Sequence, residues 1–82
     1  MFDGVRFQVF SHDHAPAHAH GSYGSMVMVV ELVAHGTVRV RRGSMQPTNA
    51  KRRDVKKVLN TARANYDYLV DLWEKTHGKA GR

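Results

Sequence analysis

The second half of the chain carries one continuous apolar stripe with the spacing of an α-helix. Its members recur at intervals of one, three or four residues, which places them on a single helical face. They are Val55, Val58, Leu59, Ala62, Tyr66, Leu69, Val70 and Trp73. We expect one helix over about 50–77, with Thr48 or Asn49 as its N-cap and Gly78 at its end. At 1.5 Å per residue it is roughly 40 Å long, so its last turns extend past the sheet. Trp73 is expected to be mostly buried there, against the sheet or a partner.

Alternating and valine-rich segments in the first half predict three strands, at about 5–10, 26–33 and 37–42. The strand at 26–33 has apolar residues on both faces, which indicates that the helix covers one face and a second subunit the other. Pro16 disfavours a central strand, so an extended or looped segment is expected there, followed by a turn at 21–25. The predicted fold class is α+β, a small antiparallel sheet of about three strands packed on one long C-terminal helix.

The 82 residues are expected to form one domain, 1–82, with a loose tail at 78–82. The chain has no cysteine, which excludes disulfides and thiolate metal ligands. The N-terminus does not resemble a signal peptide, and the longest apolar run, 26–30, is too short to cross a bilayer. We therefore expect a soluble cytoplasmic protein without membrane association. Its small size favours a homodimer or a hetero-complex.

The most unusual segment, 11–20, holds four of the six histidines, all at even positions. In extended backbone these side chains project to one side. They are His12, His14, His18 and His20. Imidazole titrates near neutral pH and is a common metal ligand, so this segment is the first candidate for chemistry.

Three interpretations of the segment remain open. In the first, His18 and His20, together with His14 or Asp13, form an open site for a divalent metal such as Zn, with Ni, Fe and Mn as alternatives. In the second, two imidazoles act without metal as general acid and base on RNA, whose 2′-hydroxyl is the nucleophile. In the third, the segment is structural and Asp13 caps its turn. Asp13 can orient His14 or His18 in all three.

Other candidate residues lie outside the segment. Glu31 is a more distant metal ligand. His35, at a turn, and His77, at the helix end, are expected to be local caps or exposed side chains. Tyr23, in the glycine-rich turn, is the aromatic residue best placed to stack on a base.

Positive charge is concentrated in the middle of the chain. Segment 37–63 has nine basic residues and one acid, a net charge of +8, whereas 1–36 sums to −2 and 64–82 to zero. This segregation favours an anionic partner, either a nucleic acid or an acidic protein. The residues expected to contact it are Arg39, Arg41, Arg42, Lys51, Arg52, Arg53, Lys56 and Lys57.

Five of these basic residues fall at the start of the predicted helix. The helix macrodipole disfavours cations there by about 0.3–1 kcal/mol each. A phosphate bound at the helix start would turn this cost into a gain. The repeated departure from a local rule therefore indicates function.

Two patterns together carry a family resemblance. The first is Ser-x-Asp-His-x-Pro-x-His-x-His, preceded by aromatic residues, and the second is Leu-x5-Asn-x3-Leu-x3-Trp. The matching residues are Phe7, Phe10, Ser11, Asp13, His14, Pro16, His18, His20, Leu59, Asn65, Leu69 and Trp73. The chain resembles a family of small bacterial proteins known as domain of unknown function 4160 (DUF4160). It departs from the family pattern at Ala17, where a second proline is usual, and at the stretch 21–25.

The resemblance implies no established activity. Family members look as if they often lie beside another small gene, which implies by analogy a toxin–antitoxin-like module with a cognate small protein partner. Our principal hypothesis is a small basic protein that binds a nucleic acid or a nucleic-acid complex, with the His motif as a metal or RNase-type site. The alternatives are a non-enzymatic interaction module that docks an acidic partner, and a metal-dependent small-molecule enzyme.

Overall fold

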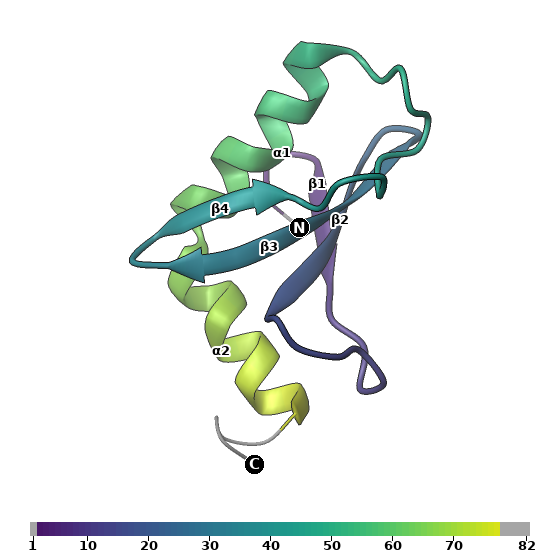
Figure 1. Ribbon diagram of the computed structural model, residues 1–82. Helices are drawn as coiled ribbons and strands as arrows, with labels where there is room; N and C mark the ends of the chain where they lie inside the picture. The colour runs from purple at the N-terminus through teal and green to yellow at the C-terminus, as the bar shows by residue number, and fades with distance from the viewer. Residues whose placement is uncertain (1, 78–82) are drawn as a thin grey trace.

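The computed structural model describes residues 2–77 and has a four-stranded sheet and two helices (Figure 1). The strands are β1 (Val5–Gln8), β2 (His18–Tyr23), β3 (Met26–Ala34) and β4 (Thr37–Val40), and the helices are α1 (Arg52–Ala64) and α2 (Tyr66–His77). Each strand pairs antiparallel with the next, in the order β1-β2-β3-β4. The predicted α+β class is confirmed, whereas the predicted three strands and single helix are wrong. The expected helix stop at Gly78 and the tail lie outside the described residues.

The strand that the sequence pattern missed is β2, which pairs with β1 on one side and β3 on the other. The expected turn at 21–25 is only a two-residue connection, with Gly24 at φ +61. Gly21 lies inside the strand, where a Cβ would be 3.0 Å from Cγ1 of Val58 and 3.2 Å from Cε1 of Phe7. This glycine therefore permits close approach of α1 to the sheet and does not form a turn.

The predicted single helix is divided at Asn65, whose backbone has φ −119 and ψ 28. Its Nδ2 donates a hydrogen bond to the carbonyl of Thr61 at 2.9 Å, and its own N–H reaches the same carbonyl at 3.1 Å. Asparagine disrupts helices in this way because its side chain competes for backbone groups. Helical hydrogen bonding resumes directly after the break, since the N–H of Leu69 donates to the carbonyl of Asn65 at 3.0 Å. The apolar stripe therefore continues from α1 into α2. Within residues 2–77, neither α1 nor α2 has the length and hydrophobicity that a membrane-spanning helix requires.

The helices pack on one face of the sheet (Figure 1). The buried core consists of Val5, Ala19, Met26, Met28, Val30, Leu32, Val38, Val58, Ala62 and Leu69. The alternate residues of β3 face the other way, and Val27 and Val33 there are 45% and 47% exposed. Within the described chain the helices thus cover one of the two apolar faces of β3, and the second subunit expected over the other face stays a prediction.

Candidate functional site

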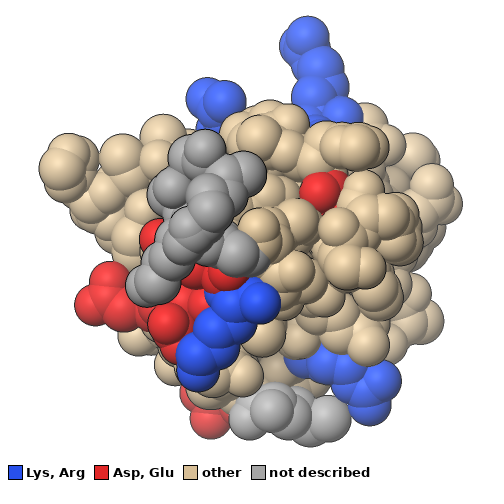
Figure 2. All heavy atoms as spheres, turned by 90° about the horizontal axis from the view of Figure 1, so that it is seen from below, with Lys and Arg blue, Asp and Glu red and all other residues tan. Residues whose placement is uncertain are grey.

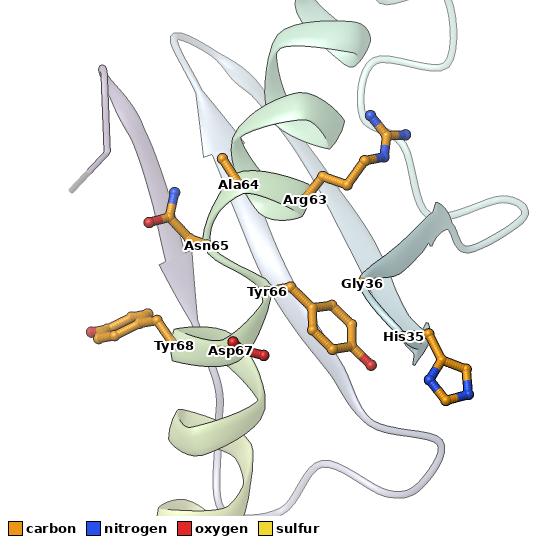
Figure 3. Close-up of a pocket in the computed structure, with 8 residues that line it drawn as sticks. All are labelled: His35, Gly36, Arg63, Ala64, Asn65, Tyr66, Asp67 and Tyr68. Carbon is orange, nitrogen blue, oxygen red and sulfur yellow. The ribbon is translucent and has the colours of Figure 1, made fainter.

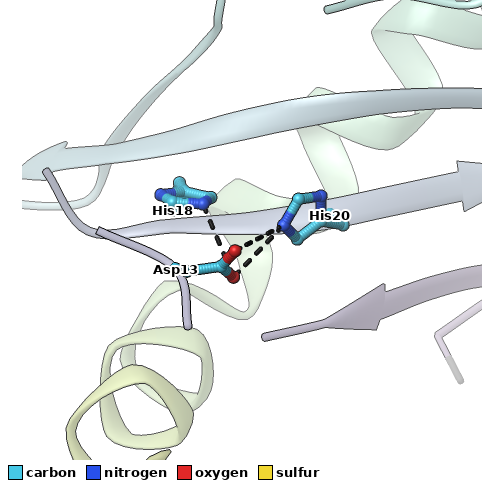
Figure 4. Close-up of side chains that lie close together, drawn as sticks. All are labelled: Asp13, His18 and His20. Atoms are coloured by element: carbon cyan, nitrogen blue, oxygen red, sulfur yellow. Dashed lines mark hydrogen bonds and ion pairs between the residues drawn. The ribbon is translucent and has the colours of Figure 1, made fainter. Parts of the chain in front are cut away.

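Asp13, His18 and His20 converge beside the first residues of β2 (Figure 4). Each offers a ligand atom, and these atoms lie within 4.8 Å of one another. Nε2 of His20 is 3.2 Å from both carboxylate oxygens of Asp13, and Nε2 of His18 is 3.5 Å from Oδ2. Ligand atoms at about 2.0–2.1 Å from a tetrahedral Zn²⁺ are roughly 3.3 Å apart. The nitrogen–oxygen separations therefore match those of a metal site.

Two local features bring these side chains together. His18 and His20 are two residues apart on β2, so both project from the same face. Asp13 comes from the loop before β2, where its N–H donates to the carbonyl of Phe10 at 3.0 Å and its Oδ2 accepts the N–H of Phe10 at 2.9 Å. Asp13 therefore closes its turn, as the structural interpretation expected, and still directs both oxygens toward the two rings.

The hydrogen bond made by Nδ1 of His18 defines what its other nitrogen can do. Nδ1 lies 2.8 Å from the carbonyl oxygen of Pro16. A carbonyl only accepts, so Nδ1 carries the proton, and a neutral His18 turns the lone pair of Nε2 toward Asp13. A lone pair facing a carboxylate is favourable only with a proton or a cation between them. Metal-ligating histidines are commonly oriented by this kind of Nδ1–H···O=C contact.

Asp13 is held in its ionised form. Burial raises the pKa of Asp13, but the hydrogen bonds from the Phe10 amide and from His20 lower it, and so do the electrostatic interactions with His20 and His18. The net result is a pKa below the ordinary value of 3.8. A carboxylate that stays ionised at low pH is ready to bind a cation.

The last turns of α2 extend past the sheet, as expected, and form one wall of the site. The ring of Trp73 lies 5.2 Å from that of His18 and stacks on His77 at 3.8 Å. Nδ1 of His77 lies 2.9 Å from the carbonyl of Trp73, and Nε2 lies 3.0 Å from the carbonyl of Asp13. Most of the surface of Trp73 is covered, as expected, although it is not fully buried, and it contacts His18 of β2 and His77. His77 does more than cap its own helix, since it ties α2 to the loop that carries Asp13.

Glu31 and Arg41 form the other wall, and Arg39 binds Glu31 from outside the site. Nε of Arg39 donates to Oε1 of Glu31 and Nε of Arg41 donates to Oε2, each at 2.8 Å. The hydrogen bonds from Arg41 and then Arg39 hold the pKa of Glu31 below its ordinary value, although burial raises it. Because both oxygens already accept from arginine, Glu31 acts as a partner of the arginines in this structure, and it lies outside the converging ligand group.

The other histidines of the motif do not join the group. A cavity of about 390 Å³ lies beside the Asp13 cluster, and the exposed His14 lines it together with the cluster but is outside the converging set. His12 is exposed and stacks on Phe10. His35 is exposed in the turn between β3 and β4, with φ +52. Of the four alternating histidines, the structure thus brings together His18 and His20.

The basic residues are divided between two places. Arg39 and Arg41 lie beside Glu31, whereas Lys51, Arg52, Arg53, Lys56 and Lys57 lie at the start of α1. Arg42 is exposed in the segment that connects β4 to α1. Seen from below, acidic side chains gather on one side of the end of the molecule where α2 finishes, whereas Lys and Arg side chains are scattered in separate places over this face (Figure 2). The start of α1 is at the opposite end (Figure 1).

The start of α1 differs from its prediction. The N-cap is Lys51 instead of Thr48 or Asn49, and it makes no side-chain capping hydrogen bond. A cavity of about 600 Å³ lies here, between the first turn of α1 and the β2–β3 turn with Tyr23. The residues in contact with this cavity include one exposed cation, Lys51, and the partly buried Asp54.

A further cavity of about 460 Å³ lies at the break between the helices, against the β3–β4 turn (Figure 3). Tyr66 points toward His35, whereas Arg63 and Tyr68 point away from each other. No group of three metal-ligating side chains comes together there among the described residues. The Asp13 cluster is therefore the place where chemistry-bearing side chains are organised.

Comparison with known proteins yields one match. The model of a family described as a domain of unknown function (DUF4160) matches residues 4–74. The search of curated proteins and the search of solved structures found no match to the chain. The matched segment contains the whole Asp13 cluster and the wall residue Trp73, and it ends before His77.

Proposed function

We propose a function from the site itself, because the chain belongs to the DUF4160 family and the description of that family assigns none. The protein binds one divalent transition-metal ion through Asp13, His18 and His20. It is a cytoplasmic protein that presents this ion to a nucleic acid or a nucleic-acid complex held by its basic residues. The observation that carries the proposal is the convergence of two imidazole nitrogens and one carboxylate within 4.8 Å.

The donor set favours a metal over a metal-free acid–base pair. An acid–base pair needs ring nitrogens that face the substrate. Here Nε2 of His18 and Nε2 of His20 both face Asp13, and Nδ1 of His18 is taken by Pro16. Two imidazoles and one carboxylate suit Zn²⁺ or Fe²⁺ and leave coordination positions free for water or substrate. Zn²⁺ is the ion to test first.

The nucleic-acid part of the proposal rests on charge. Lys51, Arg52, Arg53 and Lys56 are exposed at the start of α1. Because α1 begins beside the β2–β3 turn, these cations and the Asp13 cluster lie at opposite ends of the six-residue strand β2. At about 3.3 Å per residue this separation is roughly 17 Å along the strand. An elongated polyanion can contact both regions, whereas a single small anion cannot.

A second candidate function is a non-enzymatic module that docks an acidic protein, such as the cognate partner of a toxin–antitoxin-like pair. It is favoured by the sheet face that the helices leave open, where Val27 and Val33 of β3 are exposed and the neighbouring strand β4 carries the exposed Arg39. In that case the Asp13 cluster would serve only to fix the loop before β2.

Zinc affinity, measured on untagged protein by competition with a chromophoric chelator, tests the proposal. We expect one Zn²⁺ per chain. His20→Gln and Asp13→Asn should each weaken binding by more than about 100-fold, beyond the effect typical of outer-shell partners. The side chain of His20 is 36% exposed, so its replacement is compatible with folding, which a thermal unfolding curve would verify.

Two matched variants serve as controls. His14→Gln makes the same chemical change in the same motif, but outside the converging group, and should alter zinc affinity by less than about threefold. His35→Asn removes an exposed histidine and suits the left-handed backbone there. Equal zinc affinity in His20→Gln and wild type would refute the metal centre and leave the docking module.

A further inference from the structure

We infer that the cavity beside the Asp13 cluster binds a phosphate-type oxyanion, with Arg41 as its anion-binding residue. This inference rests on the proposed metal centre and names the class of ligand that the centre would share. The cavity has a volume of about 390 Å³, and Asp13, His14, His18, His20 and Arg41 are among its lining residues.

Arg41 is fixed by its neighbours instead of extending freely into solvent. Its Nε donates to Oε2 of Glu31 at 2.8 Å, and its side chain is 35% exposed. Glu31 is itself fixed from the other side, since Nε of Arg39 donates to Oε1 at 2.8 Å. The guanidinium is therefore preorganised, which lowers the entropic cost of each further hydrogen bond it makes.

The Nη groups of Arg41 have donor capacity to spare. Nη2 lies 3.3 Å from Nδ1 of His18, but that nitrogen carries the proton it donates to Pro16 and has no lone pair to accept another. Within residues 2–77, the Nη protons of Arg41 thus have no acceptor. A planar edge of free N–H groups matches two oxygens of a phosphate or carboxylate.

The charges around the cavity favour an anion once a metal is bound. Asp13 is the carboxylate of the metal set, and Glu31 is neutralised by two arginines. A divalent ion beside Arg41 then leaves the cavity positive. Phosphate oxygens can bind a metal ion and a guanidinium at the same time. The backbone of a nucleic acid and a free phosphate group share this chemistry.

The experiment is calorimetric titration of the protein with inorganic phosphate and, separately, with dimethyl phosphate, which models the diester of a nucleic-acid backbone. Each is titrated into metal-free protein and into protein with one equivalent of Zn²⁺. We expect binding to the zinc-loaded protein and a loss of about tenfold in Arg41→Gln, the usual effect of a charged hydrogen bond. Tight binding of the diester identifies a nucleic-acid backbone as the source, and binding of inorganic phosphate alone identifies a free phosphate group.

Arg6→Gln is the matched control. Arg6 is exposed on β1, pairs with Ser22 and does not line this cavity. The variant makes the same change in net charge and should alter phosphate affinity by less than about threefold. Arg41→Lys is a second variant that keeps the charge, and it should bind phosphate with intermediate affinity because lysine lacks the fork of donors.

The outcomes separate this inference from the metal centre. Zinc binding without binding of either phosphate would overturn the inference and leave the metal centre intact, and so would unchanged phosphate affinity in Arg41→Gln. Failure of zinc to bind would refute the metal centre alone. In that case phosphate binding by the metal-free protein still decides the inference, because it either depends on Arg41 or does not.

Discussion

The Asp13–His18–His20 cluster and the start of α1 are the two most unusual regions of the chain, and they differ in how firmly their side chains are held by surrounding residues. In the cluster every side chain has a partner, and the surrounding residues fix its geometry. At the start of α1 all the basic side chains except the partly buried Lys57 are exposed, and the helix has no side-chain cap. Among the described residues of that stretch, 51–57, one ion pair forms, between Nε of Arg53 and Oδ1 of Asp54 at 3.7 Å.

Because of this difference, the two regions suit different kinds of ligand. Fixed nitrogen and oxygen atoms a few ångströms apart suit a small ion with defined coordination. Exposed cations without fixed geometry suit a polyanion, whose phosphates are held by charge with little need for exact placement. In the proposed function, the cluster therefore supplies the selectivity, and α1 supplies a share of the affinity for a large partner.

The largest effect is expected from the triple change of Arg52, Lys56 and Lys57 to Ser. If each residue neutralises one phosphate, the slope of log K against log salt should fall by about 2.7 on B-DNA and about 2 on single strands. Affinity near 0.1 M salt should fall on the order of 100-fold, similarly for all base sequences. Stability should stay the same or rise slightly, because cations leave the helix start. Filter binding at several salt concentrations measures the slope.

A second triple variant controls for net charge. Arg6, Arg63 and Lys75 are exposed and lie outside the start of α1, so their replacement with Ser removes the same charge elsewhere. We expect its salt slope to stay close to that of the wild type. Equal slopes in both triple variants would mean that overall charge attracts the nucleic acid, and α1 would lose its special role.

The sequence predicted the α+β class, three of the strands and the apolar stripe, because those features depend on local periodicity. The predictions were wrong where the local propensity of a residue differs from the role that the residue has in the packed fold. Gly21 is a turn former by propensity, but here it makes room for Val58. Asn65 is tolerated within a helical pattern, but here its side chain binds the carbonyl of Thr61 and divides the helix.

The site was predictable in part for the same reason. Alternation identified His18 and His20, and their proximity in sequence identified Asp13. Arg41 and His77 were not connected with the motif, because they are 23 and 64 residues from their contacts there. Only the pairing of β3 with β4 and the position of α2 bring them to the site, and no local pattern encodes such contacts.

A smaller effect is expected from His77→Ala, which tests whether α2 organises the cluster. The change removes the contact between Nε2 and the carbonyl of Asp13 and the stacking on Trp73. The loop with Asp13 then becomes less fixed, and zinc affinity should fall about tenfold, as for other outer-shell partners. Lys75→Ala is the control, since it alters the same helix without touching the loop. Unchanged zinc affinity in His77→Ala would show that the cluster is fixed from β2 alone.

The smallest effect concerns the pH dependence of stability through Glu31. Hydrogen bonds from Arg41 and Arg39 hold its pKa in the folded protein below 4.5, the ordinary value expected after unfolding. The folded state therefore binds fewer protons in this range, so the stabilisation is complete above about pH 5 and is lost as the pH falls through the folded pKa. Glu31→Gln should lower the free energy of unfolding at pH 7 by under about 1 kcal/mol, because Arg39 is largely exposed. The difference between wild type and variant should shrink as the pH drops below about 4.5. Asp13, whose pKa is also lowered, is present in both proteins, so its contribution largely cancels in this difference.

Urea unfolding at several pH values measures the difference in the free energy of unfolding between wild type and Glu31→Gln, with Arg39→Gln as a graded control that keeps the bond from Arg41. A difference that stays constant with pH would mean that Glu31 does not hold Arg41 in place, and the cluster would then be no more organised on that side than the start of α1.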